Sequence, residues 1–481
     1  MKADQVLDKI LERKRADVAR RKAARPLESF RDGLRPSDRS LEEALRRPRM
    51  GFILECKAAS PSRGRIREDF DPAQIARSYA PFADAISVLT DEPFFDGRLA
   101  YLRQVRDAAD VPVLCKDFVV EPYQVFEARE HGADAILLMM SVLDDRAFGR
   151  CFEAARSLNV DVLCEVHDEA ELERVLAHGS GSPTSQPPII GVNNRNLKTL
   201  EVDLACAERL SAKIPSDRVV VGESGVSNHR DVVRLRPHCD ALLVGSALMA
   251  ADDLDLAVRR LIFGDVKVCG LTRPEDARAA FEAGATRNGV IFAPKSPRVV
   301  TPEQAEAIGR ASPAGLVGVF VNAPIEQVCG LVEALGLEAV QLHGDEGADY
   351  IARLRSALAE PTEIWQVERV DDELSISKAG ADAVLLDTFD PERRGGTGKS
   401  FDWSLLDDAA LDSVVLSGGL SPENAARADQ IGARTLDVNS GVESAPGVKD
   451  PALLEAFFAT LAGLGRGAGL GRGGDRKGER R

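Results

Sequence analysis

Residues 51–57 read Gly-Phe-Ile-Leu-Glu-Cys-Lys, an apolar run that ends in charged side chains. A short, almost continuously apolar run is typical of a parallel strand that is covered on both faces. Similar runs return along the chain, and the segments between them carry helical periodicity, as in residues 72–79 (Pro-Ala-Gln-Ile-Ala-Arg-Ser-Tyr). Alternating strands and helices predict right-handed βαβ units around a parallel sheet.

The apolar runs fall into two sets of eight. The first set is Gly51–Lys57, Ala85–Thr90, Pro112–Phe118, Ala135–Met139, Asp161–Val166, Ile189–Asn193, Arg218–Glu223 and Asp240–Gly245. The second set is Val266–Cys269, Gly289–Phe292, Leu316–Val321, Glu338–His343, Glu363–Val367, Asp382–Asp387, Ser413–Ser417 and Arg434–Val438. Because eight βα units close into a barrel, we predict an α/β chain of two tandem (β/α)8 barrels, the TIM-barrel architecture.

The predicted barrels set the domain limits. We expect the first barrel, with a charged helical extension before it, over residues 1–262 and the second barrel over residues 263–465. The apolar stripe of the extension is Val6, Leu7, Ile10 and Leu11. Residues 179–188 are rich in Gly, Ser and Pro and predict a surface insertion, and the Gly/Arg-rich residues 466–481 predict a disordered tail.

Composition excludes several classes of protein. The 481 residues include 62 Lys and Arg and 77 Asp and Glu, a net charge of −15, so nucleic acid is not an expected partner. No apolar run reaches the ~18 residues of a membrane span. The eight cysteines show no C-x-x-C pair and no His at zinc-ligand spacing, which predicts a reduced, cytoplasmic chain without metal or cofactor. The sequence does not fix the oligomeric state, and a monomer is the simplest one compatible with it.

Polar side chains gather at the predicted strand ends of the first barrel, where barrel enzymes carry their chemistry. These residues are Glu55, Lys57, Lys116, Glu165, Asn193, Arg195, Glu223 and Ser224. A purely structural set of ion pairs would explain one or two of them, but burying charge at five of eight strand ends is costly. Lys and Glu in one dry pocket shift each other's pKa, so this mouth predicts acid–base catalysis.

The second barrel carries different chemistry at its predicted mouth. Its candidates are Cys269 after the first strand, His343 after the fourth and Asp387 at the end of the sixth. An isolated cysteine is most often a core residue. Here Cys269 is expected opposite Asp387, an arrangement that fits a thiol and a carboxyl acting as an acid–base pair.

Both barrels carry glycines after the seventh and eighth strands, the usual phosphate position of this fold. The stretches are Gly222-Glu-Ser-Gly225 and Val244-Gly-Ser246 in the first barrel, and Ser417-Gly-Gly419 and Asp437-Val-Asn-Ser-Gly441 in the second. Gly395-Gly-Thr-Gly-Lys-Ser400 is not a P-loop, because Arg393 stands where the first glycine is required. We interpret that stretch as a mobile loop after the sixth strand.

Several of these motifs resemble known families. Glu55-Cys-Lys-Ala-Ala-Ser-Pro-Ser-Arg-Gly64, Leu114-Cys-Lys-Asp-Phe118, Gly191-Val-Asn-Asn-Arg195 and Gly222-Glu-Ser-Gly-Val226 resemble the indole-3-glycerol phosphate synthases. Lys267-Val-Cys-Gly-Leu-Thr272, Ala293-Pro-Lys-Ser-Pro-Arg298, Gln341-Leu-His-Gly344, Asp387 and Ser417-Gly-Gly-Leu-Ser-Pro-Glu-Asn424 resemble the phosphoribosylanthranilate isomerases. The whole resembles the fused bifunctional proteins of tryptophan biosynthesis.

The resemblance implies two consecutive reactions on phosphosugar–anthranilate substrates. The second barrel would convert N-(5-phosphoribosyl)anthranilate by an Amadori rearrangement, with Cys269 as general base and Asp387 as general acid. The first barrel would then close the indole ring with loss of CO₂ and water, with Lys116 as general acid and Glu165 as general base. How the proton transfers divide among Lys57, Lys116 and Glu165 stays open.

The resemblance also implies the residues that hold the substrates. In the first barrel Glu55 and Lys57 would assist proton transfer, and the other residues would be Ser60, Phe118, Asn193, Arg195, Glu223, Ser224, Gly225, Gly245 and Ser246. In the second barrel they would be Arg298, His343, Asp437, Gly418, Gly419, Ser440 and Gly441. The phosphate groups would be bound by Ser60, Gly225, Gly245 and Ser246 in the first barrel and by Gly418, Gly419, Ser440 and Gly441 in the second.

Two rival interpretations remain. A phosphosugar isomerase of the histidine-pathway type would show Asp at the ends of strands one and five, where the first barrel has Glu55 and Glu165. A second barrel that only binds a phosphosugar or braces the first would have lost Cys269 or Asp387, and both are present. Residues 285–292 (Ala-Thr-Arg-Asn-Gly-Val-Ile-Phe) are more polar than expected of a barrel strand and are the weakest strand prediction.

Overall fold

A computed structural model describes residues 4–61, 63–179, 189–197, 199–358, 361–370, 374, 376, 378–388, 401–407 and 409–463. Within them the chain forms two compact units, one reaching Val258 and the other starting at Arg259. Nearly all of the predicted insertion at 179–188, the loop at 395–400 and the tail at 466–481 lie outside the described residues.

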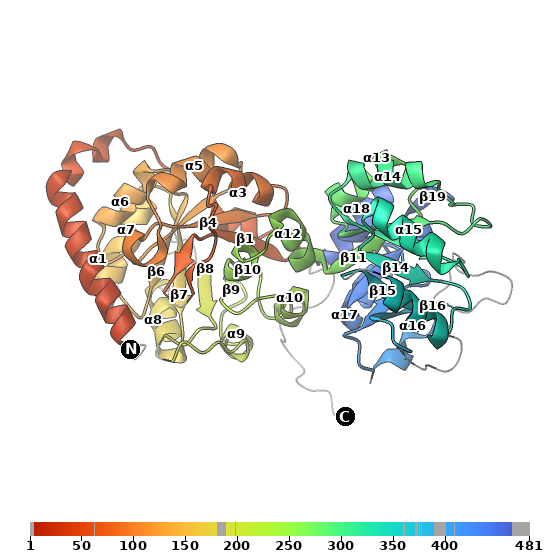
Figure 1. Ribbon diagram of the computed structural model, residues 1–481. Coiled ribbons are helices and arrows are strands. Elements are labelled where there is room, and N and C mark those ends of the chain that lie inside the picture. Colours follow the sequence, from red (N-terminus) through yellow and green to blue (C-terminus); the bar gives the residue numbers. More distant parts are fainter. Residues whose placement is uncertain are drawn as a thin grey trace, which may run out of the picture. The chain divides into compact units, whose positions relative to one another are not determined.

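The first unit is a closed barrel of eight parallel strands in the order β1-β10-β9-β8-β7-β6-β5-β4. Its strands are β1 (Gly51–Cys56), β4 (Ala85–Leu89), β5 (Val113–Lys116), β6 (Ala135–Met139), β7 (Asp161–Val166), β8 (Ile189–Asn193), β9 (Val220–Glu223) and β10 (Ala241–Val244). Two short strands, β2 (Ala59–Ser60) and β3 (Gly64–Arg65), form an antiparallel pair in the loop after β1. Helices surround the ring of strands (Figure 1).

The helices of the first unit alternate with its strands, as βαβ units require. They are α1 (Asp4–Ala24), α2 (Leu41–Leu45), α3 (Pro72–Tyr79), α4 (Glu92–Phe95), α5 (Ala100–Ala108), α6 (Tyr123–Glu130), α7 (Asp145–Ser157), α8 (Glu169–Gly179), α9 (Ala205–Ser211), α10 (His229–Leu235), α11 (Ser246–Met249) and α12 (Leu254–Phe263). Several begin at an Asp or Asn cap; Asp144, for example, accepts a hydrogen bond from the backbone N–H of Ala147. In α1, Ile10 and Leu11 are buried as the apolar stripe predicts.

The second unit is another closed barrel of eight parallel strands, in the sequential order β11 to β18. Its strands are β11 (Asp265–Val268), β12 (Arg287–Ile291), β13 (Gly315–Phe320), β14 (Ala339–Leu342), β15 (Glu363–Val370), β16 (Ala383–Thr388), β17 (Val414–Leu416) and β18 (Thr435–Val438), and an antiparallel pair β19 (Glu443–Ala445) and β20 (Val448–Lys449) follows. Its helices are α13 (Pro274–Ala283), α14 (Pro302–Ala311), α15 (Ile325–Leu335), α16 (Ala348–Ala357), α17 (Ala425–Ile431) and α18 (Pro451–Leu461). The predicted pair of (β/α)8 barrels is confirmed.

Side chains fill both barrels. The first interior contains Ile53, Leu114, Leu137 and Leu163, and the second contains Val317, Trp365, Leu385 and Val415. Layers of apolar side chains inside the ring are how this fold obtains a packed core rather than a pore. Most of the predicted site residues therefore lie at or just after the strand ends.

Strand β12 starts earlier than expected, at Arg287 rather than Gly289. Arg287 enters the strand because its guanidinium pairs with Asp265 at 2.8 Å and lies over the Trp365 ring at 5.3 Å. The weakest strand of the sequence prediction is thus paired along its length with β13.

Candidate active sites

Lys116, the last residue of β5, lies between two carboxylates from β7 and β9, alternate strands of the first barrel. Its Nζ is 3.2 Å from Oε2 of Glu165 on β7 and 3.1 Å from Oε2 of Glu223 on β9. The two carboxylate side chains are only 1% and 2% exposed. Although burial alone lowers the pKa of Lys116, Glu223 and Glu165 raise it above its ordinary value, so the ammonium form is stable.

The two carboxylates differ in their pKa. Burial raises the pKa of Glu223 to about 7, because Lys116 offsets the loss of hydration only in part and the charge of Glu165 adds to it. Burial acts the same way on Glu165, but Lys116, His167 and Asn193 more than compensate and hold its pKa below the usual range. At neutral pH Glu165 is therefore an ionised carboxylate, as a general base must be, while Glu223 is poised to share a proton.

Glu55 and Lys57 form a second pair at the same mouth. Lys57 Nζ donates to Oε1 of Glu55 at 2.6 Å, and both side chains are largely buried. Glycines make room for the carboxylates: a Cβ at Gly245 would collide with Glu55, and a Cβ at Gly191 with Glu223. The five charged residues that the sequence predicts at the strand ends of the first barrel thus lie at one mouth. They are Glu55, Lys57, Lys116, Glu165 and Glu223.

His167, which the sequence analysis missed, lies directly behind Glu165. Its Nε2 is 3.2 Å from Oε1 of Glu165, and its Nδ1 is 3.1 Å from Oε2 of Glu171. Burial lowers the pKa of His167, but the two carboxylates outweigh it and raise that pKa to about 10. The imidazolium is therefore the stable form at neutral pH. A lone His directly after a strand end is a weak signal, and only the fold shows its contacts.

Lys14 of α1 is a second residue that the sequence analysis missed. Its Nζ is 2.7 Å from Oδ2 of Asp91 and 2.5 Å from Oδ1 of Asp117, and all three side chains are buried. Asp117 also accepts hydrogen bonds from Thr90 and from the Phe118 backbone N–H. The N-terminal helix is thereby fixed to the residue that follows Lys116.

The residues expected to hold the substrate surround this cluster. Asn193 is buried, and its Oδ1 accepts from the backbone N–H of Arg195 at 2.9 Å. The Phe118 ring lies 6.2 Å from that of Phe95, and Ser60 is buried in the loop after β1. The structure therefore places these predicted residues around the same mouth.

The predicted phosphate positions lie after β9 and β10. Ser224 and Gly225 both have positive φ, of 63° and 91°, so the chain turns sharply there. A Cβ at Gly225 would collide with Val202. Gly245 caps the short helix α11, and Ser246 is its first residue. Backbone N–H groups at such a turn and helix start suit an anion.

Cys269 of the second barrel directly follows β11 and is buried, and Asp387 lies on β16. Burial raises the pKa of the Cys269 thiol, an effect that Lys267 opposes. Burial also raises the pKa of Asp387 to about 6, although a hydrogen bond from the Thr388 backbone lowers it. His343 Nε2 lies 3.5 Å from Oδ2 of Asp387. The expected thiol and carboxyl both lie near Lys267 and Asp437, and His343 lies beside the carboxyl.

Lys267 is fully buried inside the second barrel, two residues before Cys269. Its Nζ donates to both oxygens of Asp437, at 2.9 and 3.0 Å, and to Oε1 of Gln341 at 2.9 Å. The carboxylate of Asp437, which is expected to bind substrate, thus accepts hydrogen bonds from Lys267. The sequence analysis considered only residues at strand ends and therefore missed Lys267, which lies within β11.

Arg298, another residue expected to bind substrate, forms an ion pair. Its guanidinium donates to both oxygens of Glu443, at 2.9 and 2.7 Å, and Lys449 Nζ donates to Oε1 of the same carboxylate at 2.9 Å. The backbone has positive φ at the predicted phosphate glycines Gly418 and Gly419. Ser440 and Gly441 belong to a 3₁₀ turn after β18.

Neither mouth holds a cluster of metal-ligating side chains: in the described part of the chain, no three His, Cys, Asp or Glu could hold a metal ion. Among the described helices, none has both the length and the apolar character needed to cross a membrane.

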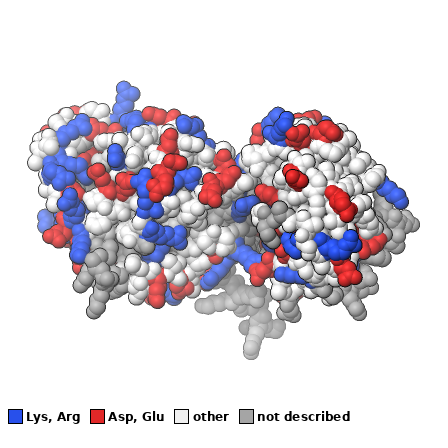
Figure 2. Space-filling model, viewed as in Figure 1, with Lys and Arg blue, Asp and Glu red and all other residues white. Residues whose placement is uncertain are grey.

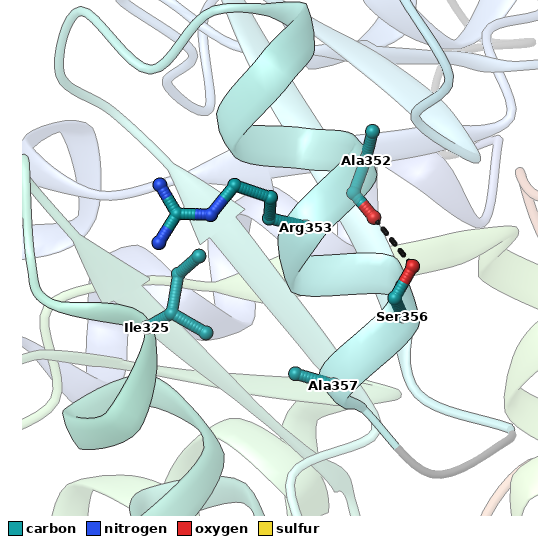
Figure 3. A pocket seen from close by; sticks show the side chains of 5 residues that line it. All are labelled: Ile325, Ala352, Arg353, Ser356 and Ala357. Atoms are coloured by element: carbon teal, nitrogen blue, oxygen red, sulfur yellow. Dashed lines mark hydrogen bonds between the residues drawn. The ribbon is translucent and has the colours of Figure 1, made fainter.

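Figure 3 shows a depression on the second unit, lined by Ile325 of α15 and by Ala352, Arg353, Ser356 and Ala357 of α16. Ser356 Oγ donates to the Ala352 carbonyl at 3.0 Å, and no predicted site residue lines this depression.

Comparisons with known proteins divide the chain into the same two parts as its two barrels. The sequence model of the indole-3-glycerol phosphate synthase family matches residues 7–261, and that of N-(5'phosphoribosyl)anthranilate (PRA) isomerase matches residues 266–460. The tryptophan biosynthesis protein TrpCF of Salmonella typhi is 46% identical, over 95% of this chain and 99% of that protein. TrpCF of Vibrio cholerae is 47% identical, over 95% of this chain and 96% of that protein.

Solved structures match the second unit. The phosphoribosyl anthranilate isomerase of Thermus thermophilus is 36% identical and covers 41% of this chain and 98% of its own, with a TM-score of 0.37. The matches to the two family sequence models and to the full-length relatives establish what the chain is. It belongs to the family of bifunctional tryptophan-biosynthesis enzymes in which an indole-3-glycerol phosphate synthase precedes a phosphoribosylanthranilate isomerase.

Proposed function

We propose that each barrel performs its reaction with the acid–base pair at its own mouth. One observation carries this proposal for the first barrel: Lys116 Nζ lies 3.2 Å from Glu165 and 3.1 Å from Glu223. In the second barrel, the corresponding observation is that Cys269 and Asp387 are both buried at strand ends. The isomerase product is the synthase substrate, so the two reactions are consecutive.

In the isomerase barrel, Asp387 protonates the ring oxygen of N-(5-phosphoribosyl)anthranilate, which opens the ring to an iminium. Cys269 then removes the proton from the neighbouring sugar carbon, and the resulting enol becomes the ketone of the deoxyribulose product. The raised pKa of Asp387, about 6, supports the acid role, because burial keeps part of this carboxyl protonated near neutral pH. Arg298, His343 and Asp437 help to hold the substrate, and its phosphate lies at Gly418, Gly419, Ser440 and Gly441.

In the synthase barrel, the anthranilate ring attacks the ketone carbon, CO₂ leaves, and the hydroxyl departs as water. The ketone oxygen takes up a proton as the ring closes, and the loss of CO₂ restores the benzene ring. Lys116 gives the proton with which the hydroxyl leaves as water, and Glu165 removes a proton from the CH₂ group beside the nitrogen, which completes the indole. The opposite pKa shifts of Glu165 and Glu223 support this division, since the base must be ionised and its neighbour must not repel it. Glu55 and Lys57 assist proton transfer and hold the anthranilate carboxylate.

The remaining synthase residues bind the sugar and the phosphate. Asn193, Arg195, Glu223 and Ser224 orient the sugar, and Phe118 contacts the aromatic ring. Ser60, Gly225, Gly245 and Ser246 take the phosphate. Two successive positive φ values at Ser224 and Gly225 support this placement, because the turn brings backbone N–H groups close to the anion.

The domain limits follow from the same proposal. We place the synthase at residues 1–262 and the isomerase at 263–465, which the family matches at 7–261 and 266–460 support. The enzyme works in the cytoplasm as a monomer, with phosphosugar–anthranilate substrates and without a cofactor.

Complementation tests the proposal. The chain should restore growth without tryptophan to two bacterial strains, one lacking only the synthase and one lacking only the isomerase. Lys116→Ala should fail only in the first strain and Cys269→Ala only in the second. Rescue of the second strain by Cys269→Ala would refute the assigned base.

A further inference from the structure

The isomerase mouth contains a chain of polar contacts that runs from the neighbourhood of its base to its acid. Lys267 lies on β11 two residues before Cys269, Gln341 lies on β14, His343 directly follows β14, and Asp387 lies on β16. Lys267 Nζ donates to Oε1 of Gln341 at 2.9 Å, and Gln341 Nε2 lies 3.0 Å from Nδ1 of His343. His343 Nε2 then lies 3.5 Å from Oδ2 of Asp387.

The direction of this chain follows from its first member. An ammonium only donates, so the Gln341 atom that faces Lys267 is the amide oxygen. The Gln341 NH₂ group therefore faces Nδ1 of His343 and must donate to it. Nδ1 is then unprotonated, and the ring proton of a neutral His343 resides on Nε2, facing Asp387.

The other end of the chain lies next to the thiol. Cys269 follows Lys267 by two residues, a spacing that in extended backbone places both side chains on the same face. Lys267 opposes the effect of burial on the pKa of the Cys269 thiol. A Cβ at Gly289 would lie 2.8 Å from Lys267 Cε and 3.0 Å from Cys269 Sγ, so the missing side chain of Gly289 leaves room for both.

We propose that Lys267, Gln341 and His343 are positioning residues that form a directional hydrogen-bond relay from Cys269 to Asp387. Lys267 stabilises the thiolate of Cys269, and Gln341 fixes the His343 tautomer. The Nε2–H of His343 then stabilises the carboxylate that Asp387 becomes once it has given its proton to the substrate. This relay rests on the proposed roles of Cys269 and Asp387.

Other charged groups also face Cys269 and enter the test. They are Asp437 on β18, Lys449 on β20 and Arg298 in the loop after β12. Among the cations, Lys267 has the largest effect on the pKa of the Cys269 thiol, and it is fully buried, so its field is little screened by water. Lys449, also buried but bound to Glu443, is a matched control.

The first experiment titrates the thiol. The ultraviolet absorbance of the thiolate is followed against pH in the full chain, as the difference from the Cys269→Ser protein. Lys267→Met should raise the titration midpoint of Cys269 by about 1–3 pH units, the usual effect of losing an adjacent opposite charge. Lys449→Met should raise it by less. An unchanged midpoint in Lys267→Met would overturn the proposal, provided that synthase activity and Trp365 fluorescence show a folded chain.

The second experiment breaks the relay in the middle. Gln341→Met leaves the Lys267–Asp437 ion pair in place and should lower the isomerase kcat about tenfold with KM unchanged, because the hydrogen bonds of Gln341 to Lys267 and to His343 are both lost. The thiol midpoint should not move. Nitrogen NMR of the histidine rings should show His343 protonated on Nε2 in the unmodified chain and a tautomer mixture in Gln341→Met. Protonation on Nδ1 in the unmodified chain would overturn the relay even if Lys267→Met does not fold.

These outcomes separate the relay from the reaction assigned above. If Cys269→Ala keeps isomerase activity, the proposed base is wrong and the relay loses its purpose. If Cys269→Ala is inactive but Lys267→Met and Gln341→Met behave as the unmodified chain, only the relay fails.

Discussion

At the scale of single residues, His167 acts together with Lys116 to keep Glu165 ionised. The imidazolium lies between Glu165 and Glu171, and its pKa is raised to about 10, above the ~6.5 of a free His. A raised pKa stabilises the fold while the group is protonated. That contribution is complete below about pH 6.5 and is lost as the pH rises through about 10.

We therefore predict that His167→Gln removes part of the pH dependence of stability. The free energy of unfolding of the first barrel should fall between about pH 7 and about pH 10 in the unmodified chain and fall less in His167→Gln. Both tryptophans, Trp365 and Trp403, lie in the second unit, so circular dichroism with Trp fluorescence separates the two transitions. Glu171→Gln, which removes one partner only, should give an intermediate result. Parallel curves for all three proteins would count against the charged His167.

Cys269 and Asp387 predict an unusual pH profile for the isomerase. Burial places the pKa of the acid, about 6, below that of the base, which is raised above its ordinary value. The reactive form, thiolate with protonated carboxyl, is thus a minor one. Its fraction rises up to about pH 6, is level above it, and falls once the thiol is fully ionised.

The expected measurement is kcat/KM of the isomerase against pH, with a break near pH 6 and a second one in the alkaline range. Asp387→Asn should lose the break near pH 6 together with most of the activity. Cys269→Ser should lower kcat/KM by about 10²–10⁴, because the hydroxyl ionises much less readily than a thiol. A profile without a break between about pH 5 and pH 8 would rule out the assigned acid.

The sequence predicts some site residues better than others. Strand ends are visible as breaks in apolar runs, so Glu55, Lys116 and Glu165 could be found without a structure. Lys267 was missed because its partners Gln341 and Asp437 lie on distant strands, although its spacing of two from Cys269 places both side chains on one face. His167 was missed because a single polar residue just after a strand is common, even though its partners Glu165 and Glu171 are close in sequence.

At the scale of elements, α1 is joined to the barrel by a buried ion pair as well as by Ile10 and Leu11. Lys14 neutralises Asp91 and Asp117, whose carboxylates would otherwise be buried without a cation. Burial lowers the pKa of Lys14, but the two carboxylates outweigh it and raise the pKa above its ordinary value. The extension is therefore part of the synthase unit.

Lys14→Met should destabilise the first barrel by about 3–5 kcal/mol, the usual effect of breaking a buried ion pair from one side. Because Asp117 directly follows Lys116, synthase activity should fall as well, while isomerase activity should not. The measurement is urea unfolding with both assays. Arg13→Met, on the same helix but with an exposed side chain, is the control and should change little. Equal stability of the two variants would contradict the role of Lys14.

The elements themselves follow closely from the sequence. Strands β6, β7 and β8 have the predicted bounds, because apolar runs between turn residues define a buried parallel strand. Strand β15 instead runs on to Val370 and β12 begins at Arg287. In both strands, polar residues belong to the sheet because they pair with a neighbouring strand. The pattern of apolar and polar residues does not show which strands pair, so it could not predict these bounds.

At the scale of the whole molecule, charge does not mark a surface for a polyanion. The net charge is −15, and on the face shown in Figure 2 positive and negative side chains are interspersed on both units. Recognition of phosphate therefore depends on local groups at each mouth. The two mouths share no residues, since each is built from the strands of one closed barrel.

The central claim is that one chain carries two independent active sites, and paired assays of two variants test it most directly. Lys116→Ala should abolish indole-3-glycerol phosphate formation and leave isomerase kcat/KM within about twofold of the unmodified chain, because distant sites behave additively. Cys269→Ala should do the reverse. If either variant, folded by circular dichroism and Trp fluorescence, lost both activities or kept both, the assignment of one reaction to each barrel would be contradicted.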